Sequence, residues 1–138
     1  MDREYIRRIM ISIDEIDELY YRMVRTMGVK ETVFVLFYAI ADGKAYSQKQ
    51  LCKEWHIPRT TLNTVVMECV KKSYIELIPN GHKEKIITLT KSGEDYARKL
   101  LNPIFEAEER AVQQIGGIRL AQELEQFSQC LKKEFDKI

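Results

Sequence analysis

Residues that interrupt helices fall at only a few places in this chain of 138 residues. They are Gly28, Gly43, Pro58, Pro79, Gly81, Gly93, Pro103, Gly116 and Gly117. Glycine breaks helices because it is too flexible, and proline because it lacks a backbone N–H. The segments between these residues carry apolar side chains at spacings of three and four, the periodicity of amphipathic helices. The chain is therefore expected to be mainly helical.

The first two segments predict helices of different character. Residues 5–27 repeat apolar side chains at i, i+3, i+4 and i+7, which predicts a long amphipathic helix ended by Gly28. Residues 31–42 are apolar almost all round. This composition favours a buried helix, although the valine and phenylalanine content also fits a strand.

The middle of the chain predicts two short helices followed by a β-hairpin. Ser47 and Gln50 have the spacing of a capping box, so a helix is expected to begin there. Pro58 suits the first turn of a second helix. Two β-prone runs, 75–78 and 85–89, flank the six-residue turn region Pro-Asn-Gly-His-Lys-Glu. A tight helix pair followed at once by a hairpin is typical of a winged helix-turn-helix.

The C-terminal third predicts two more helices. Thr90 caps a long helix that Pro103 is expected to kink. The last helix has an apolar stripe with nearly a 3.5-residue repeat, which suits pairing with another helix. The stripe consists of Leu120, Leu124, Phe127, Leu131 and Ile138. The predicted fold class is mainly α with a small β-hairpin wing. A winged helix-turn-helix region, residues 30–99, is flanked by helical dimerisation regions, residues 1–29 and 100–138.

Charge is distributed unevenly along the chain, although its net value is only +1. Residues 1–43 contain 6 basic and 8 acidic side chains, residues 44–99 contain 11 and 6, and residues 100–138 contain 5 and 7. The three balances are −2, +5 and −2. A phosphate-binding surface needs a local basic excess. The excess on the predicted winged helix therefore indicates a nucleic-acid partner.

The helix that begins near Pro58 has outward side chains suited to binding DNA. Arginine pairs with guanine, asparagine with adenine, and threonine with phosphate or the thymine methyl group. The hairpin tip supplies donors for the minor groove or the DNA backbone. An ordinary exposed helix and a solvated turn are the alternatives. The predicted DNA-binding residues are Ser47, Arg59, Thr60, Thr61, Asn63, Thr64, His82, Lys83 and Lys85.

The sequence contains no pattern typical of an enzyme or a metal site. It has no Walker loop, GxGxxG or HExxH motif, and neither His56 nor His82 belongs to a nucleophile–base motif. Cys52, Cys69 and Cys130 are too widely spaced for a metal-ligand pattern. No apolar run reaches the ~18 residues of a membrane span, and no signal peptide is evident. We expect a cytoplasmic non-enzyme with reduced thiols, no cofactor and no membrane partner.

Three segments carry a resemblance to a known family. They are Ser-Gln-Lys-Gln-Leu (47–51), Ile-Pro-Arg-Thr-Thr-Leu (57–62) and, above all, Ile-Ile-Thr-Leu-Thr-Lys-Ser-Gly (86–93). On these segments, residues from about 30 to 115 resemble the multiple-antibiotic-resistance regulator (MarR) family of bacterial transcription regulators. The terminal helices extend the resemblance over nearly the whole chain. It implies a homodimer with interlocking terminal helices, in which each winged helix binds half of a palindromic operator.

The resemblance also assigns individual positions, with some departures from the family pattern. Arg59, Thr60, Asn63 and Thr64 occupy recognition-helix positions, and Lys83 stands where the family usually has the wing arginine. Lysine lacks the bidentate fork of arginine, so this departure weakens the expectation of minor-groove insertion. His56 and Ser73 occupy positions where glycine is common. Histidine tolerates positive φ, so His56 is interpreted as a turn residue.

Some members of the family sense small phenolic or lipophilic ligands, and others sense oxidants through cysteine. By resemblance, the candidate pocket residues here are Tyr20, Phe34, Phe37, Tyr38 and Trp55. An aromatic stripe at helical spacing also fits an ordinary core. The cysteines have no evident basic activator, so redox sensing is not favoured.

Taken together, these patterns predict a sequence-specific DNA-binding transcription regulator. The expected form is a homodimeric repressor that binds a palindromic operator in double-stranded DNA and is released by a small aromatic or lipophilic effector. Two alternatives remain open at this point. One is a winged helix used as a protein-interaction module, and the other is a ligand-binding protein that does not bind DNA.

Overall fold

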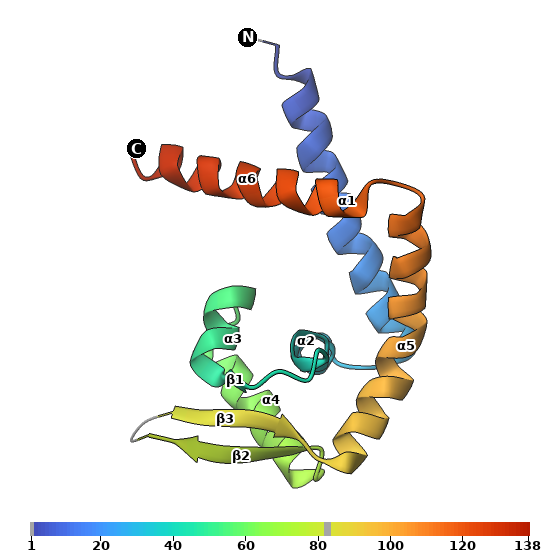
Figure 1. Ribbon diagram of the computed structural model, residues 1–138, viewed down its shortest axis with the longest axis vertical. Coiled ribbons are helices and arrows are strands. Elements are labelled where there is room, and N and C mark those ends of the chain that lie inside the picture. Colours follow the sequence, from blue (N-terminus) through green and yellow to red (C-terminus); the bar gives the residue numbers. More distant parts are fainter. Residues whose placement is uncertain (1, 82–83) are drawn as a thin grey trace. The chain divides into compact units, whose positions relative to one another are not determined.

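The computed structural model describes residues 2–81 and 84–138 and has the predicted fold class (Figure 1). The chain divides into two compact units, Met1–Arg98 and Lys99–Ile138. Within the described residues, no helix combines the length and apolarity needed to cross a membrane. The elements are α1 (Glu4–Met27), α2 (Glu31–Ile40), β1 (Tyr46–Ser47), α3 (Gln48–Trp55), α4 (Arg59–Lys71), β2 (Ile75–Asn80), β3 (Glu84–Leu89), α5 (Lys91–Gln113) and α6 (Gly117–Phe135).

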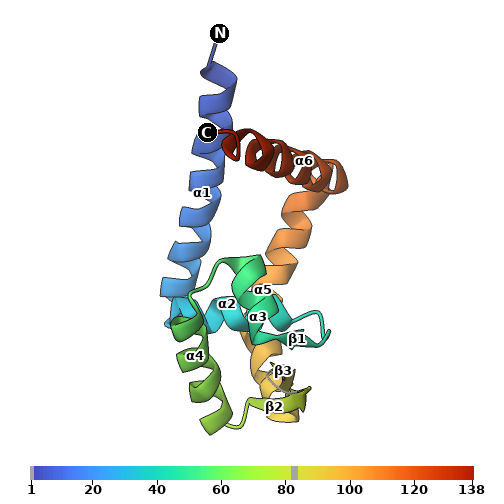
Figure 2. The ribbon, with the colours of Figure 1, turned by 90° about the vertical axis from the view of Figure 1, so that its left-hand side faces the viewer.

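The first two helices follow the sequence prediction. α1 ends at Gly28, whose φ of 69° is left-handed and whose N–H donates to the Arg25 carbonyl at 3.1 Å. α2 is a helix and not a strand, and its Leu36 and Phe37 side chains are fully buried. Only Val24 of α1 is buried. Figure 2 shows the N-terminal part of α1 extending away from α2, α3 and α4.

The helix-turn-helix pair is set by local hydrogen bonds and two left-handed residues. The predicted capping box is present, because the Ser47 hydroxyl accepts the Gln50 N–H and the Gln50 side chain accepts the Ser47 N–H. His56 ends α3 with φ 53°, which confirms its interpretation as a turn residue. Ser73 has φ 62° just after α4. Both residues adopt the left-handed conformation that glycine adopts at lower cost.

The sheet contains one strand more than the predicted hairpin. Its order is β1-β3-β2, all antiparallel, and Ser47 pairs with Ile86. β1 has two residues, too few for a periodic signal in the sequence. The prediction of a six-residue turn was wrong, since Pro79 and Asn80 continue the ladder opposite Lys85 and Glu84. Pro79 is tolerated because β2 is an edge strand.

The junction between α4, the hairpin and α5 explains the most specific segment of the sequence. The Thr90 hydroxyl caps α5 by accepting the Gly93 N–H at 3.0 Å, as predicted. The Thr90 and Ser92 hydroxyls both donate to the Ser73 carbonyl. A Cβ on Gly93 would lie 1.9 Å from the Tyr74 carbonyl oxygen. Glycine at this position therefore allows the start of α5 to approach the end of α4.

The second unit contains a helix with an exposed apolar stripe. α6 is fully described, and none of its residues is buried. Leu120 and Leu124 are each 40% exposed, and Phe127 and Leu131 are half-buried. Ile138 lies beyond the end of the helix at Phe135, which corrects its predicted place in the stripe. Such a stripe on an isolated chain is suited to burial against another surface.

Candidate nucleic-acid interface

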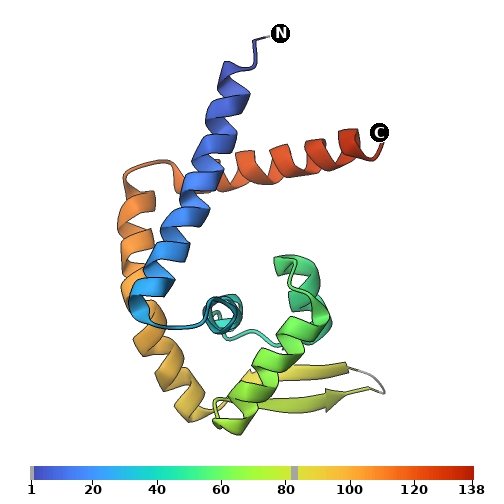
Figure 3. The same cartoon turned by 180° about the vertical axis from the view of Figure 1, so that it is seen from behind.

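α4 separates its side chains into an inner and an outer face. Leu62, Val65 and Val66 are buried, and α4 lies alongside the β2–β3 hairpin (Figure 3). The predicted recognition residues Arg59, Thr60, Asn63 and Thr64 are all exposed, whereas Thr61 is half-buried. The first two turns of α4 therefore present a guanidinium, an amide and hydroxyl groups to solvent. This is the arrangement that a recognition helix needs.

A groove of about 630 Å³ lies between the start of α3, the start of α4 and strand β3. It brings together five of the predicted residues, since Ser47, Arg59, Thr60, Asn63 and Lys85 all line it. It is also lined by Gln48, Lys49, Cys52 and Glu84. Of the described predicted residues, Thr61 and Thr64 lie outside the lining. The Thr64 hydroxyl donates to the Thr60 carbonyl at 3.0 Å.

Ser47 differs from the other groove residues because it is only 2% exposed. Its hydroxyl and N–H are both engaged in the capping box with Gln50. Its backbone also pairs with β3 through Ile86. Ser47 therefore positions the start of α3 against the wing strand, and its hydroxyl is already used within the chain.

The groove has an excess of positive charge. Lys49, Arg59 and Lys85 line it, and Glu84 is the only acidic residue in the described lining. Within residues 2–81 and 84–138, none of these three cations forms an ion pair. Unpaired cations in a concave surface attract polyanions and are free to exchange counterions for phosphates.

Sequence reasoning missed some of the groove residues. Gln48 has a buried side-chain nitrogen, Nε2, without a hydrogen-bond partner in the described chain, and buried donors are normally satisfied. Cys52 and Glu84 also line the groove. Cys52 lies one turn into α3, and Glu84 is the first residue of β3. That both line one groove depends on the strand pairing, which no local pattern in the sequence indicated. The predicted tip residues His82 and Lys83 lie outside the described residues.

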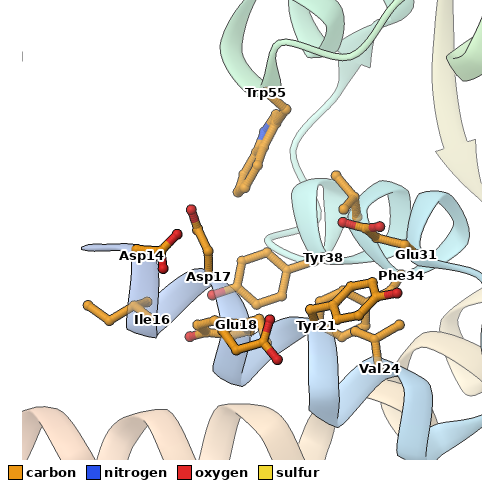
Figure 4. Close-up of a pocket in the computed structure, with 12 residues that line it drawn as sticks. Asp14, Ile16, Asp17, Glu18, Tyr21, Val24, Glu31, Phe34, Tyr38 and Trp55 are labelled. Carbon is orange, nitrogen blue, oxygen red and sulfur yellow. The ribbon is translucent and has the colours of Figure 1, made fainter. Parts of the chain in front are cut away.

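A second cavity, of about 720 Å³, lies between α1, α2 and the end of α3 (Figure 4). Four of the residues named in the pocket hypothesis line it: Tyr20, Phe34, Tyr38 and Trp55. Tyr38 is the central ring, with centroids of Tyr20, Phe34 and Trp55 at 6.2, 5.6 and 5.8 Å. Phe37 was predicted to belong to this set, but it does not line the cavity. It is 0% exposed and packs edge-on against Tyr74 and Tyr96 in the core, on the other side of α2.

The cavity is also lined by four carboxylates that sequence reasoning missed: Asp14, Asp17, Glu18 and Glu31. The first three have the spacing i, i+3, i+4, which places them on one face of α1. This spacing was a usable signal, because it coincides with the helical period of the neighbouring aromatic residues. Figure 4 shows Trp55 projecting from α3 toward the side chains of α1 and α2.

The cysteines differ in their surroundings. Cys69 is buried, and this burial raises the pKa of its thiol. Cys52 is half-buried in the groove and Cys130 is exposed. Among the described residues, no group of three or more histidine, cysteine or acidic side chains could hold a metal ion.

Several solved structures share this fold. A MarR family regulator from Neisseria meningitidis superposes with a TM-score of 0.84 at 18% identity, covering 99% of both chains. A MarR family transcriptional regulator from Silicibacter pomeroyi gives 0.72 at 15% identity, covering 91% of this chain and 93% of its own. NadR in complex with 4-hydroxyphenylacetate gives 0.71 at 10% identity, covering 88% of each chain. No protein-family model matches the sequence, and no curated protein matches it. The chain has the winged-helix fold of MarR family regulators.

Proposed function

We propose that the chain is a sequence-specific DNA-binding transcription regulator of the MarR family, which acts in the cytoplasm as a homodimeric repressor of a palindromic operator. The observation that carries this proposal is the groove between α3, α4 and β3. Arg59 and Asn63 from α4 and Lys49 and Lys85 from its two walls converge there. The similarity of the fold to MarR family regulators supports the same function.

In this proposal, the residues that give affinity for DNA differ from those that give preference for a particular DNA sequence. Lys49 and Lys85 attract phosphates and release condensed counterions, which makes binding strong but independent of sequence. Arg59 and Asn63 are exposed on the first turns of α4, where they reach base edges in the major groove. Thr60 lines the same groove and contacts phosphate or a thymine methyl group.

The exposed apolar side chains of the terminal helices support the homodimer. On α1, Tyr5, Ile9 and Ile16 are between 36% and 56% exposed, and α6 exposes Leu120 and Leu124. Apolar surfaces of this kind on a single chain mark interfaces. Because a twofold dimer presents two equal recognition helices about one DNA turn apart, the operator is expected to be palindromic.

The aromatic cavity between α1 and α2 supports control by a small molecule. Its volume is typical of ligand sites, and four of the predicted aromatic residues line it. A structural neighbour, NadR, holds 4-hydroxyphenylacetate. We therefore propose that a small aromatic effector occupies this cavity and releases the repressor from DNA.

The test is duplex binding measured by fluorescence anisotropy over a series of salt concentrations. One duplex comes from the DNA upstream of the protein's own gene, and the other has a shuffled sequence. Arg59→Ala is expected to cost about 1–3 kcal/mol on the upstream duplex only, since it removes a base contact. Lys85→Ala is expected to weaken both duplexes and to lower the salt slope by about one, since it removes a phosphate contact.

A matched control is Lys71→Ala. Lys71 is exposed in the last turn of α4 and lies outside the groove lining, so its loss should leave both affinities nearly unchanged. Equal losses of Arg59→Ala on the two duplexes would remove its base-reading role. A folded dimer that shows no salt-dependent binding to either duplex would favour the protein-interaction module, and ligand binding without duplex binding would favour a ligand-binding protein.

A further inference from the structure

The cavity between α1 and α2 has a charge that a generic aromatic site does not explain. Its lining contains four carboxylates, and among the described residues that line it there is no lysine, arginine or histidine. Aromatic rings form much of the remaining wall. A cationic donor binds the carboxylate of an aromatic acid most strongly, and the described lining contains none. This cavity presents the opposite charge.

Most of the acidic groups at the cavity are not neutralised from within the chain. Glu18 is paired, with its Oε1 3.6 Å from Arg22 Nε. Across residues 2–81 and 84–138, Asp14, Asp17 and Glu31 form no ion pair. They therefore remain available to a ligand.

The basic side chains near the cavity have partners within the chain, and two of these partners, Glu18 and Tyr21, line the cavity. Arg22 is also 3.6 Å from Glu15, on the side of α1 that does not line the cavity. Lys30, which precedes Glu31, pairs with Glu68 of α4 at 3.6 Å. Arg25 lies over the Tyr21 ring, with its Cζ 5.6 Å from the centroid. None of these cations lines the cavity, and three of its four carboxylates form no ion pair among the described residues, so the lining keeps a negative excess.

The aromatic rings are arranged in a way that suits a cation. The Tyr38 ring is nearly perpendicular to Trp55, at 84°, and to Tyr20, at 77°. Rings at right angles present faces and edges in different directions around one space, and ring faces attract cations. Aromatic walls combined with carboxylates are the two features that recognise organic ammonium groups.

We propose that this cavity binds an organic cation with an aromatic body, such as a protonated or quaternary amine, in preference to an aromatic acid. The rings contact the apolar body of the ligand, and the neighbouring Asp14 and Asp17 on α1 attract its positive end (Figure 4). Binding of the cation does not depend on the proposed regulator function. Its action as an effector does rest on that function.

Helix α3 gives this ligand a route to the DNA groove. Trp55 lines the cavity at the end of α3, whereas Gln48, Lys49 and Cys52 line the groove at its start. α3 has eight residues, so the two ends are about 12 Å apart. A ligand that displaces Trp55 together with α3 would also displace Lys49.

The experiment compares three probes that share a hydroxyphenyl ring and a two-carbon arm: tyramine is a cation, tyrosol is neutral, and 4-hydroxyphenylacetate is an anion. Trp55 is the only tryptophan of the chain, so its fluorescence reports occupancy of the cavity in the full-length protein. Calorimetric titration checks each affinity. We expect tyramine to bind at least about tenfold tighter than tyrosol, and the acid to bind weakest.

Two variants test whether the preference for tyramine comes from carboxylates that line the cavity. Asp17→Asn is expected to lower tyramine affinity several-fold and to leave tyrosol affinity unchanged, because it removes charge and keeps volume. Glu4→Gln is the control on the same helix, since Glu4 lies outside the cavity lining and forms no ion pair among the described residues. It should change neither affinity. The comparison of the three probes on the unaltered chain does not depend on either variant folding.

The outcomes separate this proposal from the proposed function. Absence of tyramine binding at millimolar concentration, equal affinity for the three probes, or tightest binding of the acid would overturn the cation site. Equal losses from Asp17→Asn and Glu4→Gln would also overturn it, because they would show that only the general charge of α1 matters. Tyramine binding without any duplex binding would support the cation site and reject the regulator.

Discussion

The groove and the cavity are two concave regions of the first unit, and they differ in charge. The groove carries Lys49, Arg59 and Lys85 against Glu84, whereas the cavity carries only acidic side chains among its described charged residues. The net charge of +1 describes neither region. Electrostatic attraction acts locally, within about 10 Å at moderate salt. The partner of each region therefore follows from its own residues.

The two regions are also joined by one short helix. Cys52 lies in the groove and Trp55 lines the cavity, and the two residues are three positions apart on α3. Each carries a side chain that can be followed separately, a thiol by alkylation and an indole by fluorescence. The difference between the regions can therefore be tested within the same molecule.

The largest effect is expected from a change that destabilises both regions together. Gly93→Ala places a Cβ 1.9 Å from the Tyr74 carbonyl oxygen, so the start of α5 must shift away from the end of α4. We expect a loss of about 2–3 kcal/mol in the free energy of unfolding, the usual cost of overpacking at a rigid contact. Chemical denaturation followed by circular dichroism measures it. Duplex binding and tyramine binding should fall together with the folded fraction.

Gly116→Ala is the control for this prediction. A Cβ at Gly116 meets only the Arg119 Cβ at 3.6 Å, and its φ of −78° suits alanine. Stability should change by less than about 0.5 kcal/mol, as for most exposed substitutions. A stable Gly93→Ala protein would show that the contact with Tyr74 relaxes easily and that the two regions do not share this junction.

The fold was largely predictable because its signals are local. The end of α1 at Gly28, the capping box of Ser47 and Gln50, and the cap of α5 by Thr90 depend on residues at most three positions apart. β1 and the true length of the hairpin were not predictable, since they depend on pairing between strands distant in sequence.

The second largest effect is expected on the alkylation rates of the three cysteines, which distinguish the groove from the cavity. Saturating duplex should slow alkylation of Cys52 about tenfold at tenfold excess over Kd, since only the free form reacts. Cys130 is exposed and outside the groove, so its rate should not change. Cys69 should be slowest throughout, because burial and the raised pKa of its thiol lower the thiolate fraction at any given pH. Peptide mass spectrometry gives the three rates.

Measuring the same alkylation rates with tyramine in place of the duplex sharpens the difference between the groove and the cavity. Tyramine occupies the cavity and does not cover the groove, so Cys52 should remain reactive. Protection of Cys130 by duplex, or no protection of Cys52, would place DNA on another surface.

The candidate sites were only partly predictable from the sequence. Arg59, Asn63 and Lys85 were predicted individually, but their convergence on one groove depends on the packing of α3, α4 and β3. Phe37 was wrongly grouped with the cavity aromatics. It follows Phe34 by three positions and precedes Tyr38 by one, and spacing alone did not separate the core face of α2 from the cavity face.

The smallest expected effect comes from the one acidic side chain in the described lining of the groove. Glu84→Gln removes a negative charge from a surface that otherwise attracts phosphate. We expect both duplexes to bind about two- to fivefold tighter, corresponding to less than 1 kcal/mol for an exposed charge. Glu76→Gln on β2 is the matched control, since Glu76 is exposed but lies outside the groove lining, and it should leave both affinities unchanged. If Glu84→Gln instead weakened only the upstream duplex, Glu84 would accept a hydrogen bond from a cytosine amino group, and the groove would read sequence from the wing strand as well as from α4.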